Sequence, residues 1–270
     1  MIWTSGEVVE RLSIDVNDRT FEHGLGLFET LRTWDGYPSL LGRHLDRLMR
    51  SAVDLGLEVD PSGLPGPRDV EALLAAEGRE GDAMLRITAS GGGVQDRRSI
   101  VWMRAADLPS PSKSTQALLQ WVYDGGGLDA YKTLNYWERR NSHSRAHDAG
   151  WDEAIFVSGD EIREGSRSNI FFVVDDRLIT PPLQARRPIV PGVMRGLVLK
   201  RAQKSGLRAE EAVVSWKSLP DYTEAFLTNS ARGIVPLRKI ANHGFPAPGN
   251  RTARLWDEVR RWLELGGDAR

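Results

Sequence analysis

The sequence predicts an α+β (mixed α/β) protein made of two domains. Segments with the two-residue period of a strand and segments with the three- to four-residue period of a helix occur in both halves of the 270-residue chain. They do not alternate regularly, as they would in a doubly wound sheet. The run 108–114 holds two prolines among serines, which disfavour helix and strand alike. We therefore expect a first domain over 1–107, a linker over 108–114 and a second domain over 115–270.

The first domain is expected to combine strands with two helices. An apolar-rich run behind glycines predicts a strand over 26–33, and Asp35-Gly36 predicts the hairpin turn that follows it. From Leu40 to Leu55, apolar residues recur at three- and four-residue spacing, which is one face of an amphipathic helix that ends near Gly56. The other elements expected here are a helix over 70–76 and strands over 83–89 and 100–103.

The second domain is expected to contain more strands than helices. Gly159-Asp160 and Asp175-Asp176 supply turns between strands, and a proline at 191 precedes a helix. The last helix is amphipathic, since apolar residues line one side of it. We expect strands over 117–123, 153–157, 169–174, 177–180, 224–229 and 233–237, and helices over 137–149, 193–204 and 252–265.

Charge and composition exclude several classes of function. The 36 Lys and Arg residues nearly balance the 37 Asp and Glu residues, which argues against binding to nucleic acid or to a membrane surface. The absence of cysteine excludes disulfides, zinc-thiolate sites and thiol nucleophiles. The N-terminus carries acids and no long apolar run, and no stretch approaches the roughly 18 apolar residues of a spanning helix. We expect a cytoplasmic protein.

Three familiar motifs are absent or incomplete. The run Gly24-Leu25-Gly26 begins like a dinucleotide-binding fingerprint, but Glu29 stands where its last glycine belongs, and a strand follows instead of a helix. There is no phosphate-binding GxxxxGK[ST] loop, and the run 164–169 lacks the second glycine of a nucleophile elbow. His143 and His147 are spaced to share a metal on a helix, but two surface histidines explain them more simply, so we expect no metal site.

A lysine and an acid remain as candidates for chemistry. Lys132 lies among aromatic and apolar residues where a loop leads into a helix; an amine desolvated there would be nucleophilic, whereas a surface lysine is the simpler alternative. Glu164 lies in an expected loop, where a carboxylate is usually solvated, but it could also bind the protonated ring nitrogen of a cofactor.

Two further segments are candidates for binding an anion. The run 191–195 opens a helix, whose first backbone N–H groups can bind a phosphate, although an ordinary proline-started helix explains it equally well. The run 228–230 places three hydrogen-bonding side chains at the end of a strand, and it carries little meaning alone.

Seven segments follow one another in a recognisable order. They are FETLR (28–32), WDG (34–36), HLDRL (44–48), KTLN (132–135), EGSRSNI (164–170), PGVMR (191–195) and FLTNS with the following VP (226–236). This order resembles the fold-type IV pyridoxal-phosphate (PLP) enzymes, the class IV aminotransferases, a family that includes D-amino-acid and branched-chain aminotransferases and aminodeoxychorismate lyase. The resemblance implies a small N-terminal α/β domain and a larger C-terminal pseudo-barrel domain, with PLP as cofactor.

The resemblance also implies roles for individual residues. Lys132 matches the lysine that forms the internal aldimine with PLP and moves the proton between the substrate α-carbon and the cofactor. Glu164 matches the acid that binds the pyridine nitrogen, and Arg47 matches the arginine that binds the phosphate. The remaining residues assigned to cofactor binding are Asn169, Val193, Met194 and Ser230.

The chain departs from the family pattern at three places. Relatives often have Gly-Asp-Gly before the first motif, where this chain has Gly24-Leu25-Gly26. Many relatives have a threonine where Met194 stands, so only the backbone contact to phosphate is expected there. D-amino-acid aminotransferases bind the substrate carboxylate with an arginine that follows the strand matching 83–89, where this chain has Thr-Ala-Ser-Gly at 88–91. The residues that we assign to the substrate pocket are Phe28, Arg86, Arg97, Arg98, Tyr136 and Ala231, and one of the three arginines is expected to bind the carboxylate.

We therefore predict a PLP-dependent aminotransferase that moves an amino group between an amino acid or primary amine and a 2-oxo acid. The sequence after Lys132 is closer to the D-amino-acid and lyase branches than to the branched-chain branch, so D-amino acids are favoured. One alternative is aminodeoxychorismate lyase, which eliminates pyruvate to give 4-aminobenzoate, with Thr30 as a candidate hydroxyl donor. The other is a non-catalytic relative. The resemblance implies a homodimer with the active site at the interface.

Overall fold

The structure is a computed structural model that describes residues 1–110, 114–123, 126–184 and 187–267. Its contacts divide the chain into two compact units. Unit 1 comprises Met1–Pro109, Tyr131–Tyr136 and the C-terminal segment from Leu263, and unit 2 comprises Ser110–Ala130 and Trp137–Trp262, as far as they are described. The short segment Tyr131–Tyr136, which the sequence-based division assigns to the second domain, thus packs with unit 1. The expected linker lies partly outside the described residues, at 111–113, and the domain limits stay a prediction.

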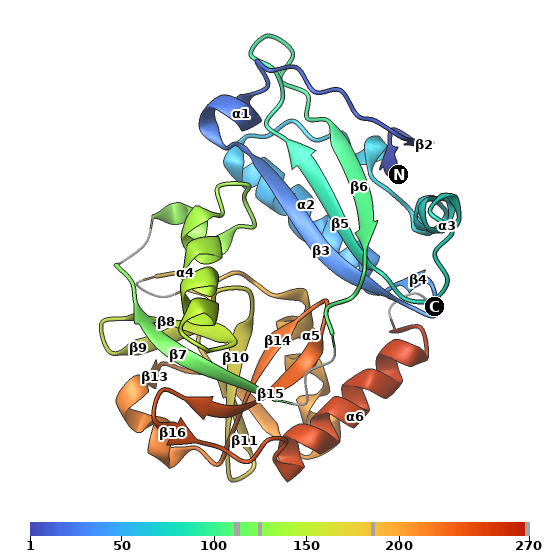
Figure 1. Cartoon of the computed structure of the whole chain (residues 1–270). Coiled ribbons are helices and arrows are strands. Elements are labelled where there is room, and N and C mark those ends of the chain that lie inside the picture. Colours follow the sequence, from blue (N-terminus) through green and yellow to red (C-terminus); the bar gives the residue numbers. More distant parts are fainter. Residues whose placement is uncertain (111–113, 124–125, 185–186, 268–270) are drawn as a thin grey trace. The chain divides into compact units, whose positions relative to one another are not determined.

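Unit 1 is built on an antiparallel sheet with the strand order β2-β1-β6-β5-β3-β4. The long strand β3 pairs along most of its length with β5, and β5 pairs with β6, as Figure 1 shows. The strands are β1 (Ile2–Thr4), β2 (Glu7–Val9), β3 (Gly26–Trp34), β4 (Tyr37–Pro38), β5 (Met84–Ser90) and β6 (Val101–Ala106).

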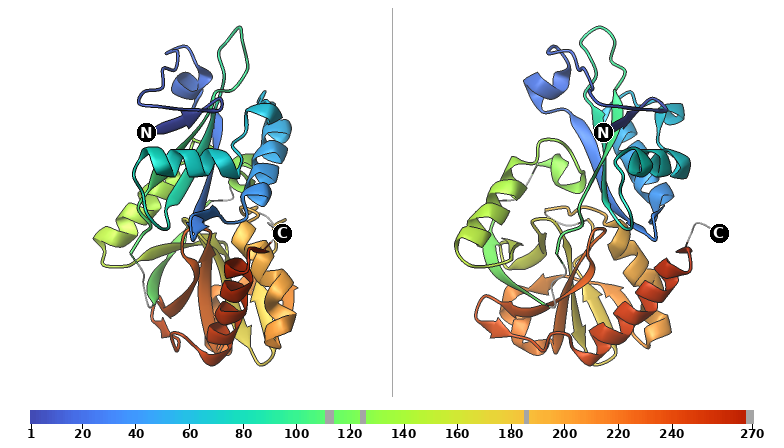
Figure 2. Two further views of the ribbon diagram at one scale, coloured as in Figure 1. Left: turned by 90° about the vertical axis from the view of Figure 1, so that its right-hand side faces the viewer. Right: turned by 45° about the vertical axis from the view of Figure 1, so that its right-hand side comes forward.

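Two helices cover one face of this sheet. The helix α2 (Leu41–Leu55) and the helix α3 (Pro67–Ala76) contribute to the same apolar core as the strands, and the right-hand view of Figure 2 shows both beside the sheet. The left-handed Gly56 ends α2, as the sequence predicts. The short α1 (Arg19–His23) and the 3₁₀ turn η1 (Pro61–Gly63) lie in the connections.

The two faces of β3 have different surroundings. Leu27 and Leu31 belong to the core under the helices, and Glu29, between them, hydrogen-bonds to side chains of α2. Because side chains alternate along a strand, Phe28 and Thr30 lie on the opposite face. The predicted turn after β3 is confirmed: Asp35 and Gly36 both have positive φ, which joins β3 to β4 tightly.

Unit 2 is a larger mixed sheet with the strand order β12-β11-β10-β14-β15-β7-β8-β9-β13, and β16 pairs with β15. In this order four strands separate β10 from β9, namely β14, β15, β7 and β8, yet β10 and β9 are in contact. The sheet therefore curls toward a closed barrel. This confirms the pseudo-barrel that the family resemblance implies. The strands are β7 (Thr115–Trp121), β8 (Glu153–Ser158), β9 (Glu161–Gly165), β10 (Asn169–Val174), β11 (Arg177–Thr180), β12 (Arg208–Glu211), β13 (Val214–Ser215), β14 (Glu224–Asn229), β15 (Gly233–Ile240) and β16 (His243–Gly244).

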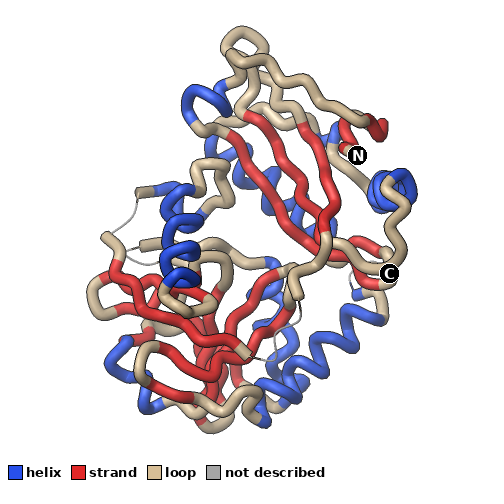
Figure 3. Tube along the Cα trace, in the orientation of Figure 1, coloured by secondary structure: helices blue, strands red, loops and turns tan. Residues whose placement is uncertain are grey.

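Helices lie around this sheet, as Figure 3 shows. The helix α4 (Trp137–Asp148) packs on β7 and β8, and α5 (Val193–Arg201) packs on β14. The helix α6 (Asn250–Glu264) places the Trp256 ring against Gly233, where any Cβ would overlap the ring. The 3₁₀ turns are η2 (Gly127–Ala130), η3 (Ala202–Ser205) and η4 (Trp216–Asp221).

Most predicted elements are confirmed to within a few residues, and the strands over 169–174, 177–180 and 224–229 coincide with the structure. The expected helix over 193–204 ends as an α-helix at Arg201 and continues as η3. The interpretation of Glu164 as a loop residue is wrong, because it lies in β9. Part of the expected loop over 124–127 lies outside the described residues. No helix in the described ranges is long and apolar enough to cross a membrane.

Candidate active site

Lys132 lies beside the start of β3, in a segment that belongs to unit 1. Its carbonyl oxygen accepts a hydrogen bond from the Phe28 backbone N–H at 2.9 Å, and the next residue, Thr133, forms an isolated bridge with Leu27. The Leu134 N–H donates to the Gly26 carbonyl at 3.0 Å. Gly26 has a φ of 132°, and a Cβ there would stand 2.7 Å from Leu134 Cδ1, so this close approach requires glycine. The segment that carries Lys132 is therefore fastened to the sheet by its backbone.

The Lys132 amine lies over two aromatic rings. Its Nζ is 4.3 Å from the centre of the Phe28 ring and 5.6 Å from that of Tyr136. The two rings pack edge to face, with centres 5.1 Å apart. The Arg86 guanidinium stacks on the same Phe28 ring, with Cζ 3.8 Å from its centre. One aromatic ring thus holds an amine and a guanidinium together on the face of the sheet opposite the helices.

A buried ion-pair network lies on the other face of β3. Glu29 accepts hydrogen bonds from Arg47 at both carboxylate oxygens, at 2.7 Å from Nε and 2.5 Å from Nη2. His44 Nδ1 lies 2.7 Å from Glu29 Oε2, and no hydrogen-bond partner for His44 Nε2 is found in the described residues. Burial opposes ionisation, but the Arg47 and His44 charges prevail and lower the pKa of Glu29 to about 2. Burial also lowers the pKa of His44.

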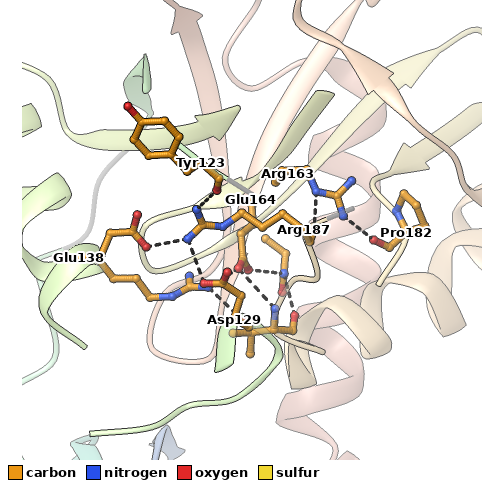
Figure 4. A network of polar contacts seen from close by, with 10 residues as sticks. Tyr123, Asp129, Glu138, Arg163, Glu164, Pro182 and Arg187 are labelled. Atoms are coloured by element: carbon orange, nitrogen blue, oxygen red, sulfur yellow. Dashed lines mark hydrogen bonds and ion pairs between the residues drawn. The ribbon is translucent and has the colours of Figure 1, made fainter. Parts of the chain in front are cut away.

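Glu164 is the buried centre of a polar network in unit 2 (Figure 4). Its Oε1 accepts from Arg139 Nη2 at 2.5 Å and from the Val190 backbone N–H at 3.4 Å, and its Oε2 accepts from Asn169 Nδ2 at 3.2 Å. Burial raises the pKa of Glu164 above its ordinary value, although the Arg139 charge opposes the shift. A further positive group beside this carboxylate would stabilise its ionised form.

Two buried arginines brace the loop that leads to α5, as Figure 4 shows. Arg163, the residue before Glu164, donates to the carbonyls of Arg187 at 2.9 Å and Pro182 at 3.1 Å. Arg187 in turn donates to the Tyr123 carbonyl at 2.7 Å, and its Nη2 lies 2.9 Å from Asp129 and 2.6 Å from Glu138. The loop is thereby tied to β9 on one side and to the start of α4 on the other.

The start of α5 is suited to an anion. Its N-cap residue is Gly192, which supplies no side-chain cap, so the first backbone N–H groups keep their capacity to donate. A Cβ on Gly192 would overlap Asn169 Oδ1, and the Asn169 amide also donates to the Val190 carbonyl at 3.0 Å. Asn169 pairs in register with Thr228 of β14, whose buried Oγ1 has no hydrogen-bond partner in the described part of the chain.

The structure brings some of the predicted residues together. Lys132, Phe28, Arg86 and Tyr136 form one cluster in unit 1. Arg47 lies in the same unit, paired with Glu29, and its assignment to phosphate stays a prediction. In unit 2, Glu164 and Asn169 are in contact, Val193 and Met194 open α5, and Ser230 and Ala231 lie in the turn after β14. Arg97 and Arg98 lie in the exposed loop after β5, and the described contacts do not join them to the Lys132 cluster.

Sequence reasoning assigned no role to Glu29, His44, Arg139 or Glu153. A signal for Glu29 exists: it occupies an inward position of an apolar strand, where a carboxylate requires a buried partner. Arg139 carries no such signal, since α4 is polar on all sides and its buried positions do not stand out.

Comparison with known proteins gives consistent matches. The sequence model of the family described as "Amino-transferase class IV" matches residues 26–240. D-alanine aminotransferase from Bacillus licheniformis is 25% identical over 93% of both chains. The structure of a branched-chain aminotransferase from Thermoproteus uzoniensis superposes with a TM-score of 0.86 at 25% identity, covering 99% of this chain and 95% of that one. The structure of 4-amino-4-deoxychorismate lyase from Pseudomonas aeruginosa superposes with a TM-score of 0.81 at 30% identity, covering 98% of this chain and all of that one.

Proposed function

This chain belongs to the class IV amino-transferase family and is a PLP-dependent enzyme, and on that premise we propose that it is an aminotransferase. It moves an amino group between an amino acid or primary amine and a 2-oxo acid. We favour D-amino acids over branched-chain L-amino acids as substrates, because the sequence after Lys132 is more similar to the D-amino-acid and lyase branches than to the branched-chain branch. The contact of Arg86 and Lys132 with one Phe28 ring supports the proposal, since an arginine that could bind a carboxylate and the amine assigned to the cofactor share this ring.

The chain offers groups that fit PLP. The uncapped N-terminus of α5 at Val193 and Met194 suits the phosphate, together with Ser230. The buried hydroxyl of Thr228, for which the described residues offer no hydrogen-bond partner, is a further donor at this end of β14. Glu164 suits the protonated ring nitrogen, because burial raises its pKa and a positive partner would favour its ionised form. When bound, PLP supplies an electron sink for bonds that break at the substrate α-carbon.

Lys132 acts as the amine that holds the cofactor and as the base that moves the α-proton of the substrate. The backbone bonds of its segment to Gly26 and Phe28 fix the position of its main chain. Its Nζ lies against the faces of the Phe28 and Tyr136 rings, which attract an ammonium. A positioned acid–base group of this kind contributes about 10²- to 10⁴-fold to the rate.

Glu164 keeps the ring nitrogen of the cofactor protonated. Arg139 and Asn169 orient its two oxygens, and the Val190 N–H completes the arrangement. Because the carboxylate is buried, water does not screen its interaction with a cation.

Arg86 binds the substrate carboxylate. Of the three arginines that the sequence offers for this task, Arg86 alone stacks on the ring that also contacts Lys132. Arg97 is instead exposed and lies 3.7 Å from Glu58. A guanidinium suits a carboxylate because its donors form a planar fork.

Aminodeoxychorismate lyase activity is the second candidate. Thr30 of β3 is paired in register with Arg86 of β5, so its hydroxyl lies on the same face of the sheet. The 30% identity to a lyase of known structure also favours this candidate. A non-catalytic role is not retained, because the chain is an enzyme of this family.

The family resemblance further supports a homodimer. A light-scattering mass of about 60 kDa, twice 30.1 kDa, would establish the dimer, and a mass near that of one subunit would exclude it.

The visible absorbance spectrum of the purified enzyme tests these proposals. We expect a cofactor band that shifts when D-amino acids are added and shifts less with branched-chain L-amino acids. Product analysis with aminodeoxychorismate separates the second candidate, since elimination releases pyruvate and 4-aminobenzoate. A bound-cofactor band that no amine shifts would exclude transamination, and the absence of any band with added PLP would contradict the assignment of Lys132.

A further inference from the structure

A second buried carboxylate lies beside the turn that follows Glu164. Glu153, the first residue of β8, is 5% exposed. The hydroxyl of Ser166 donates to its Oε1, and the hydroxyl of Ser168 donates to its Oε2 at 3.1 Å. The Ala154 backbone N–H also donates to Oε1, at 3.0 Å. Both oxygens of one carboxylate are thus bound by the same short turn.

The turn itself is closed tightly around this carboxylate. The Gly165 N–H donates to the Ser168 carbonyl at 2.7 Å, and the Ser166 N–H donates to the Ala154 carbonyl at 2.9 Å. A Cβ on Gly165 would overlap Ser168 Oγ and stand 3.3 Å from Glu153 Cδ. The turn and the carboxylate therefore fit together only with glycine at this position.

The two ends of the turn carry the residues assigned to the cofactor. Glu164 precedes Gly165 at the end of β9, and Asn169 follows Ser168 at the start of β10. Their side chains meet at 3.2 Å. The conformation of residues 165–168 fixes the separation of these two backbones, and hence whether Asn169 can orient the Glu164 carboxylate.

Glu153 holds the turn as an anion. Burial opposes its ionisation, but donors and charges from His143, Ser166 and Arg167 lower its pKa below the ordinary value. The nearest imidazole atom, His143 Nδ1, lies 3.7 Å from Oε1. An ionised carboxylate accepts at both oxygens, whereas an amide accepts at one only, so the charge matters for holding two hydroxyls.

We propose that Glu153 is a positioning residue, which holds the turn 165–168 through Ser166 and Ser168 and so sets Asn169 against Glu164. This inference rests on the proposed function, in which Glu164 binds the cofactor. Glu153 itself touches neither cofactor nor substrate in this proposal. Its effect on cofactor binding passes through Glu164.

The test measures the dissociation constant of PLP from the full-length apoenzyme, together with the melting temperature of the same apoenzyme. We expect Glu153→Gln to weaken PLP binding about ten- to hundredfold, since it leaves a buried hydroxyl without its acceptor. Ser168→Ala should act in the same direction, about threefold, and it keeps the Glu153 charge if the first variant fails to fold. Asp160→Asn is the matched control, because Asp160, in the preceding turn between β8 and β9, is an exposed carboxylate that binds Lys217, and its substitution should leave PLP binding unchanged.

A double-mutant cycle separates positioning from general loss of structure. If Glu153 acts through Glu164, then Glu153→Gln combined with Glu164→Gln should bind PLP as weakly as Glu164→Gln alone, within about twofold. The proposal would be overturned if the double variant bound PLP more weakly than Glu164→Gln by the full factor that Glu153→Gln causes alone. It would also be overturned if Glu153→Gln lowered the melting temperature but left PLP binding unchanged. If Glu164→Gln alone leaves PLP binding unchanged, the assignment of Glu164 to the cofactor is wrong. This result distinguishes a failure of the proposed function from a failure of the positioning role of Glu153.

Discussion

Arg47 of α2 and Glu29 of β3 form a two-point ion pair inside unit 1. Nε lies 2.7 Å from Oε1 and Nη2 lies 2.5 Å from Oε2, and the carboxylate is 1% exposed. Such a planar, two-point contact fixes both side chains in orientation as well as in distance. It fixes α2 against β3, the strand whose opposite face carries Phe28 and the Lys132 amine.

Replacing this carboxylate should change stability in a pH-dependent way. The pKa of Glu29 is about 2, against an ordinary value of 4.5, so its contribution to stability is present above about pH 4.5 and is lost as the pH falls toward 2. A shift of this size corresponds to about 3 kcal/mol. In urea unfolding, Glu29→Gln should lower the free energy of unfolding by about 3–5 kcal/mol at pH 7, because the buried Arg47 guanidinium loses the negative charge of Glu29, and should flatten the acid dependence.

The control for this prediction is Glu58→Gln. Glu58 is 61% exposed and lies 3.7 Å from Arg97, so its substitution should change stability by less than about 1 kcal/mol. A Glu29→Gln protein with the full acid dependence of the wild type would show that another group is responsible.

Lys132→Ala should abolish turnover. Loss of the acid–base group alone costs at least about 10²- to 10⁴-fold. Borohydride reduction followed by intact-mass measurement should show PLP fixed to the wild type and not to the variant. Lys200→Ala, which removes an exposed amine from α5, should keep both the mass increase and the rate. Cofactor fixed to Lys132→Ala would place the reactive amine elsewhere.

Arg86→Met should discriminate between classes of amino donor. Methionine preserves the apolar contact with Phe28 but removes the cation, so KM for amino acids should rise about ten- to hundredfold, while turnover of primary amines without a carboxylate should be little changed. Arg98→Met, in the exposed loop after β5, should leave both substrate classes unaffected. If instead Arg98→Met raises KM for amino acids and Arg86→Met does not, Arg98 in the loop after β5 binds the substrate carboxylate.

The sequence predicts the fold better than it predicts the surroundings of the site. Strands such as β10 and β14 are apolar runs between turn residues, and their bounds follow directly from that pattern. The strand β9 was missed because its buried positions include Arg163 and Glu164, charged residues that do not produce an apolar pattern. Their burial is possible only because carbonyls and side chains from distant segments satisfy them.

The same reason explains what could be predicted of the candidate site. Lys132 and Glu164 stand in recognisable motifs, whereas Arg139 and Glu153 acquire their roles from contacts across 25 and 13 residues. Arg86, Arg97 and Arg98 are equivalent candidates in the sequence. Only the folded sheet, which stacks Arg86 on Phe28, distinguishes them.

Glu224 should stabilise unit 2 by capping α6. Its carboxylate accepts from the backbone N–H groups of Arg251 at 2.9 Å and Thr252 at 2.7 Å, in the first turn of the helix. Glu224→Gln removes the charge at the helix N-terminus and one acceptor, and should lower the free energy of unfolding by about 1–2 kcal/mol. Glu210→Gln breaks a half-exposed pair with Arg177 and should cost at most about 1 kcal/mol. If Glu224→Gln and Glu210→Gln lowered the free energy of unfolding equally, the cap on α6 would contribute no more to stability than a surface ion pair does.

Two glycines of the α5 region provide a matched pair of substitutions. Gly192 has an ordinary φ of −59°, so Gly192→Ala introduces no backbone strain, but its Cβ would overlap Asn169 Oδ1. The displaced amide would lose its contacts with Glu164 and with the Val190 carbonyl, so PLP binding should weaken about tenfold.

Gly196, one turn further along α5, has no atom within 4 Å of the position of a Cβ. Gly196→Ala should therefore raise the melting temperature, since alanine is favoured over glycine in a helix by about 1 kcal/mol, and should leave PLP binding unchanged. Measuring PLP dissociation and melting temperature for both variants separates the steric effect at Asn169 from a general effect on the helix. If Gly192→Ala binds PLP as tightly as the wild type does, Asn169 does not orient Glu164 for the cofactor, because displacing Asn169 would otherwise weaken PLP binding.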